Sequence, residues 1–191
     1  LEDLTTALIT AAHMIRATCP TQAALSAPER LTLMQQRIGV MIQAQAKVQP
    51  ALIKFYDLLD EEQEARLKAL ADDRRKSANG EREAPAQASA PAQPAALRWP
   101  EDIETRLRLN DAQRAALKAL QDANGMAMGL LSTPPPDDTT TPPARLDAVE
   151  GRLNALQQAV YLVNTALGEF YAALSDEQKA QFEAFGQKRT T

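Results

Sequence analysis

Two long stretches of the chain place apolar residues at alternating intervals of three and four. The pattern runs from Leu31 to Leu59, and it returns at an offset of 115 residues from Leu146 to Leu174. A repeat close to 3.5 residues predicts one long helix in each half of the chain, with a single apolar seam along it. In the first copy Gln45 interrupts the seam, and Pro50 removes a backbone donor and is expected to bend the helix.

The same organisation occurs twice along the chain and predicts an all-α fold of two homologous helical-hairpin units. In each unit a shorter apolar-periodic segment leads through a proline-rich loop to the long helix, and a short helix follows. We assign residues 1–76 to the first unit and residues 98–188 to the second, and we expect Phe55–Tyr56 to superpose on Phe170–Tyr171. Residues 77–97 are rich in Ala and Pro and hold no large apolar side chain before Leu97, which predicts a flexible linker, with a partly helical segment as the alternative.

A five-residue motif recurs at three helix starts: LDEEQ, LNDAQ and LSDEQ. In each copy a leucine precedes a residue suited to capping a helix, and a glutamine follows three places after the cap. This is the spacing of a capping box, in which the cap side chain accepts from a backbone amide and the glutamine returns to the amide of the cap. The motif therefore predicts a structural helix-start clamp at Leu59, Asp60, Gln63, Leu109, Asn110, Gln113, Leu174, Ser175 and Gln178.

These Leu-x-x-x-Gln motifs resemble the LTxxQ family of Spy/CpxP-like proteins. The second unit has a pair of motifs, whereas the first has only LDEEQ, and Asp, Asn or Ser stands where the family has threonine. The resemblance implies an all-helical periplasmic protein that acts as an ATP-independent chaperone or as an envelope-stress or metal-response accessory. Such proteins are often dimers, and the duplication could instead pair two units within one chain, so a homodimer is left open.

Composition and charge exclude several other functions. The formal net charge of −4 and the pI near 5.1, with basic and acidic residues interleaved, are unfavourable for nucleic acid. No apolar run approaches the roughly 20 residues of a membrane span. His13 and Cys19 are the only residues of their types, so neither a metal site nor a cofactor is predicted, and the role of Cys19 is left open. The carboxylates gather at helix starts, where the helix dipole favours them, and we predict no catalytic residue and no enzyme.

Several apolar residues lie away from the seam of the long helices. One explanation is a thicker core that another helix covers, and the other is a contact surface for the second unit, another chain or an unfolded client. As candidate client or partner surface we take Leu33, Val40, Ile42, Ile53, Tyr161 and Leu162.

From these observations we expect a non-enzymatic, Spy-like periplasmic protein that binds unfolded or envelope clients. The alternative is a structural or assembly subunit that docks on a partner protein, and a metal-responsive accessory is disfavoured by the lack of ligands. The chain opens on LEDLTTAL in mid-helix pattern. We therefore expect the natural precursor to extend upstream of Leu1, with an export signal and a further Leu-x-x-x-Gln motif.

Overall fold

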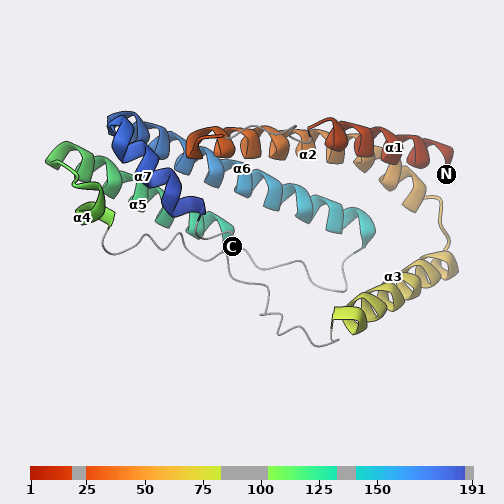
Figure 1. Cartoon of the computed structure of the whole chain (residues 1–191). Coiled ribbons are helices and arrows are strands. Elements are labelled where there is room, and N and C mark those ends of the chain that lie inside the picture. Colours follow the sequence, from red (N-terminus) through yellow and green to blue (C-terminus); the bar gives the residue numbers. More distant parts are fainter. Residues whose placement is uncertain (19–24, 83–102, 133–140, 188–191) are drawn as a thin grey trace.

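The fold is entirely helical in the part of the chain that the structure describes. The computed structural model describes residues 1–18, 25–82, 103–132 and 141–187, and it contains no strand there. This confirms the predicted all-α class. The helices of these residues (Figure 1) are α1 (Glu2–Ala17), α2 (Ala27–Tyr56), α3 (Glu61–Arg82), α4 (Ile103–Leu107), α5 (Asp111–Leu131), α6 (Pro142–Ala173) and α7 (Asp176–Gln187).

The two long helices, α2 and α6, begin in the same way. Their N-caps, Ser26 and Thr141, both have extended backbone, and proline follows in the first turn of each helix, where a missing amide costs no hydrogen bond. In α2 the carboxylate of Glu29 accepts hydrogen bonds from the Ser26 amide at 2.7 Å and from its hydroxyl at 2.8 Å. Pro50 lies inside α2 without ending it.

The helices form a layered bundle in the order α1, α2, α6, α5. Each long helix packs on the shorter helix before it, and α2 also packs on α6 (Figure 1). Contacts between Thr32 and Asn164, and between Gln49 and Asp147, join the start of each long helix to the end of the other. The long helices are therefore antiparallel, and the two units pack along them.

These contacts between the units are reciprocal under the 115-residue offset. Asn164 donates its side-chain amide to the Thr32 hydroxyl at 3.1 Å, and the equivalent pair is Gln49 with Asp147. Leu31 packs on the core of the second unit, and its equivalent, Leu146, packs on the core of the first. An approximate two-fold relation thus brings the halves of one chain together as two subunits of a dimer would be.

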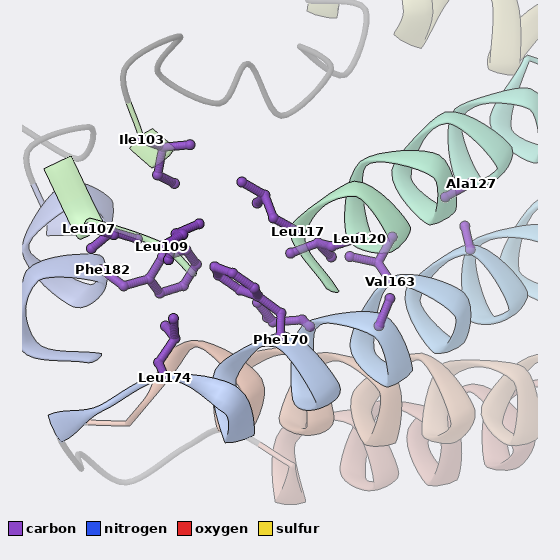
Figure 2. Close-up of a cluster of buried hydrophobic side chains, with 13 residues drawn as sticks. Ile103, Leu107, Leu109, Leu117, Leu120, Ala127, Val163, Phe170, Leu174 and Phe182 are labelled. Atoms are coloured by element: carbon purple, nitrogen blue, oxygen red, sulfur yellow. The ribbon is translucent and has the colours of Figure 1, made fainter. Parts of the chain in front are cut away.

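The second unit holds most of the buried core. Leu120 and Phe170 are fully buried among side chains from α4, α5, α6 and α7 (Figure 2). In the described part of the first unit the buried cluster is formed by Ala11, Ala44 and Val48, and Ile38 is buried outside it. Since small side chains bury little apolar area, the first unit gains less from packing.

The short helices that end the two units differ in position. Helix α7 returns to the bundle and contributes Phe182 to the core of the second unit. Helix α3 stands apart from the layer and points away from the end of α2 (Figure 1). It continues to Arg82, into the segment assigned to the linker, and residues 83–97 of that segment lie outside the described residues.

Candidate functional site

Each of the three motifs forms reciprocal hydrogen bonds at a helix start. The backbone amide of Gln113 donates to Asn110 Oδ1 at 2.9 Å, and Gln113 Oε1 accepts from the backbone amide of Asn110 at 3.0 Å. In the first unit, the Gln63 backbone amide donates to Asp60 at 2.8 Å, and Gln63 Oε1 accepts from the Asp60 backbone amide at 3.1 Å. At the start of α7 the same two bonds between Gln178 and Ser175 measure 3.3 and 2.8 Å. Each glutamine side chain is therefore held by the cap of its own helix, with its Nε2 group directed elsewhere.

In the second unit the glutamines of the two motifs also bind each other. Gln113 Nε2 donates to Gln178 Oε1 at 2.9 Å and to the Ala173 carbonyl at 2.7 Å. Gln178 Nε2 donates in turn to Gln113 Oε1 at 3.2 Å and to the Leu107 carbonyl at 2.8 Å. We call this arrangement of Gln113 and Gln178 the glutamine clamp, and it ties α4 and the start of α5 to the junction of α6 and α7.

The end of α4 supplies one of the backbone carbonyls to which the glutamine clamp binds. Arg108 has a φ of 50°, in the left-handed region, and the Leu109 amide donates back to the Glu104 carbonyl at 3.1 Å. This helix ending leaves the Leu107 carbonyl available to Gln178 and directs Leu109 into the core, where it is buried. The sequence pattern predicted the caps but not this pairing. The one feature of the sequence that could have indicated the pairing is the presence of two motifs in the same unit.

The first unit has only half of this arrangement. The Gln63 side chain accepts from the backbone amide of the cap residue Asp60, but Gln63 is exposed. Within the described residues Gln63 Nε2 donates no hydrogen bond. The leucine before the cap, Leu59, is only partly buried, whereas Leu109 and Leu174 are buried.

Glu183 holds α7 against the start of α2. Its carboxylate accepts from the Ala27 backbone amide at 2.6 Å and from the Arg30 guanidinium at 2.9 Å. The Phe182 ring packs edge-on against Phe170 and Tyr171, with centroid separations of 5.7 and 6.2 Å. Burial, with the nearby Glu183 carboxylate, raises the pKa of Tyr171 above its usual range.

At the equivalent positions of the first unit this attachment is missing. Lys68 stands in place of Glu183 and cannot accept a hydrogen bond, and Pro142 stands in place of Ala27 and has no amide to donate. The Tyr56 hydroxyl donates instead to Glu64 on α3 at 3.1 Å. Burial first, and then this contact, raise the pKa of Tyr56. These substitutions explain why α3 does not dock as α7 does.

A cleft remains between α3 and the start of α6, and we call it the α3 cleft. Its walls combine apolar and charged side chains, and they include Tyr56, Glu64, Leu67, Lys68, Pro142 and Arg145. In the second unit the equivalent space between α7 and α2 is closed by the Glu183 hydrogen bonds.

The residues predicted as a client or partner surface lie at different depths. Tyr161 has an exposed fraction of 58%, and Leu33 and Ile53 are exposed to a smaller degree. Val40, Ile42 and Leu162 are half-buried. Further exposed apolar residues were not identified as surface from the sequence, because several follow the core periodicity of their helices. They are Leu1, Leu8, Ile9, Met34, Leu58, Leu70 and Val149.

The described residues provide no group of three or more His, Cys, Asp or Glu side chains suited to a metal ion. His13 is exposed on α1, and Cys19 lies outside the described residues. None of the helices that the structure describes is long and apolar enough to cross a membrane. The interactions found among the described residues are thus apolar contacts and hydrogen bonds at helix starts.

The described residues form an all-helical protein in which the glutamine clamp joins two helix starts. The sequence model of the family described as LTXXQ motif family protein matches residues 1–71 and 97–186, which together are most of the chain. The chain therefore belongs to the LTXXQ motif family, and the two matched ranges are consistent with a two-unit arrangement. This family is associated with periplasmic proteins of the Spy and CpxP type. No curated protein and no solved structure matches the chain.

Proposed function

We propose that this protein is a non-enzymatic periplasmic chaperone or envelope-stress accessory that holds unfolded client proteins. The single observation that supports this most directly is the uneven distribution of apolar side chains. Most of the buried ones belong to the second unit, whereas most of the large exposed ones belong to the first. The second unit thus supplies a stable body, and the first unit, together with the exposed Tyr161 on α6, presents apolar surface to a partner.

The exposed residues suit clients of varied sequence. Leu8, Met34, Ile53 and Tyr161 are exposed, and they come from three different helices. Methionine and other unbranched or amphipathic side chains adapt to different contact shapes, which favours a broad range of partners over one precise fit.

The test measures whether the purified chain suppresses aggregation of a chemically unfolded client. We expect the wild-type chain to slow light scattering by the client, and the double variant Tyr161→Ser with Leu162→Ser to slow it less, because two apolar contacts are lost. Helical content and melting should stay nearly unchanged. The matched control replaces two polar residues of the same helix, Gln158→Ser with Glu169→Ser, and should protect as the wild type does.

Two results would contradict the proposal. If the Tyr161 and Leu162 variant unfolds, these residues belong to the core and the surface lies elsewhere. If the wild-type chain in several-fold excess protects no client, the chaperone function is wrong.

The second candidate is an assembly subunit that docks permanently on one partner. The half-formed clamp of the first unit favours it, because Gln63 is positioned by its cap and the neighbouring Leu58 has an exposed fraction of 74%. A partner that co-purifies in fixed stoichiometry, together with failure of the aggregation assay, would support this role over the chaperone.

A further inference from the structure

In the second unit, side chains of α7 fill the space between this helix and the rest of the bundle. There, Phe182 and Phe185 of α7 face the core, and Glu183 between them accepts from Ala27 and Arg30 at the start of α2. The Phe182 ring also contacts Phe170 and Tyr171 at the end of α6. An aromatic pair with a carboxylate between its members therefore closes this space.

The first unit keeps the aromatic pair that ends its long helix but changes the residues of its last helix. Under the 115-residue offset Phe55 and Tyr56 correspond to Phe170 and Tyr171, but Leu67, Lys68 and Leu70 stand in place of Phe182, Glu183 and Phe185. Tyr56, Leu67 and Lys68 line the α3 cleft. Leu70 has an exposed fraction of 63%, so it does not fill the place that Phe185 takes. The place of Phe182 holds the smaller side chain of Leu67, which is half-buried and lines the α3 cleft, while the place of Phe185 is left open.

From this comparison we propose that the α3 cleft binds an unfolded segment of a client protein in which two aromatic residues flank an acidic one, as in Phe-Glu-x-Phe. This rests on the proposed function and names the class of client segment. An aromatic ring enters the cleft beside Leu67 and packs against Tyr56, and the carboxylate is placed beside Lys68.

The charges of the α3 cleft select for one carboxylate rather than many. Lys68 and Arg145 lie on its walls, but Glu61 and Glu64 line it as well. A run of acidic residues would meet these glutamates and be repelled, whereas a single carboxylate between aromatic residues reaches Lys68. The aromatic rings provide the larger part of the contact area.

The binding experiment uses the full chain and a fluorescently labelled peptide with the sequence of residues 176–187, DEQKAQFEAFGQ, which contains the proposed pattern. We expect saturable binding by fluorescence anisotropy. A peptide in which serine replaces both phenylalanines should bind at least about tenfold more weakly, since an aromatic anchor in a pocket contributes more than that factor.

Variants of the chain locate the peptide. Lys68→Glu removes the basic partner and adds a carboxylate to α3, so it should weaken binding by about tenfold or more. The control Lys47→Glu makes the same charge change at an exposed position of α2 and should alter binding by less than about twofold, as expected for a charge away from the contact. Circular dichroism of both variants checks that helical content is retained.

The proposal is overturned if the serine peptide binds as well as the phenylalanine peptide, or if Lys68→Glu and Lys47→Glu bind alike. It is also overturned if no saturable binding occurs. The aggregation assay on the same proteins separates the two ideas. Protection of clients without peptide binding leaves the chaperone function standing and removes this site. Peptide binding that depends on Lys68, without protection, supports the site and contradicts the chaperone function.

Discussion

The side-chain amides of Gln113 and Gln178 hydrogen-bond to each other across 65 residues of sequence, at 2.9 and 3.2 Å. Each of these glutamines also caps its own helix and donates to a backbone carbonyl at the other motif. The motif therefore works at two levels, first as a local cap and then as a contact between two helix starts.

Changing Gln178 to glutamate should destabilise the second unit. A glutamate at this position still accepts from the Ser175 amide, but it loses the Nε2 donor and leaves the Leu107 carbonyl without its partner. We expect the free energy of unfolding to fall by about 1–3 kcal/mol in urea denaturation. The control is Gln63→Glu, the same change at the exposed first-unit motif, which should cost under about 0.5 kcal/mol. Equal effects of the two changes would mean that the glutamine clamp adds nothing beyond the caps.

Replacing Gln45 with methionine should stabilise the protein. Gln45 lies buried in the seam of α2, where the equivalent residue of α6 is the buried Val160, and its Oε1 atom has no hydrogen-bond partner in the described residues. A methionine of similar volume removes this unpaired oxygen, so we expect a gain of about 1 kcal/mol in the free energy of unfolding. Gln43→Met, at an exposed position of the same helix, is the control and should change stability little. A loss of stability at Gln45 would show that its bonds to Glu150 and the Leu146 carbonyl outweigh the buried oxygen.

Glu183→Lys should release α7 from the start of α2. The substitution introduces the residue found at the equivalent position of α3, removes the acceptor of the Ala27 amide and places two cations together. We expect faster hydrogen exchange of the α7 amides and a loss of about 1–2 kcal/mol in the free energy of unfolding, a range that allows for solvent screening at the half-exposed Arg30. Glu169→Lys, on the exposed face of α6, should leave α7 protected. Unchanged exchange in α7 would contradict the role assigned to Glu183.

The start of α2 should lose stability in acid through Glu29. Hydrogen bonds from the Ser26 hydroxyl, and then from its amide, lower the pKa of Glu29 below the unfolded value of 4.5. Because the folded pKa is the lower one, this stabilisation is complete above pH 4.5 and is lost as the pH falls through the folded pKa. Glu29→Gln does not titrate, so its melting temperature should drop less between about pH 6 and about pH 3 than that of the wild type. Parallel curves for both proteins would contradict the assignment.

Local patterns along the chain predicted much of the fold. The alternating spacing from Leu31 and from Leu146 indicated α2 and α6, because one helical face must be apolar to pack. The capping spacing at Asp60, Asn110 and Ser175 marked the starts of α3, α5 and α7, because a cap and its glutamine lie within one turn. These features depend on neighbours in sequence, which is why single positions could be assigned.

The candidate site was less accessible from the sequence. The two short helices share the same motif and the same apolar spacing, so the sequence alone does not separate Leu67 from its equivalent Phe182. Only the spatial neighbours of Lys68 and Glu183 distinguish them, and those neighbours come from the start of the other unit's long helix.

By itself the sequence determined the all-helical class, the duplicated organisation and the three capped helix starts, because helix periodicity and capping act over a few residues. Tertiary structure decided that Gln113 pairs with Gln178, that α7 docks and that α3 stands away from the bundle. Those outcomes depend on contacts between distant segments, where one carboxylate at Glu183 and one missing amide at Pro142 separate a closed space from an open cleft.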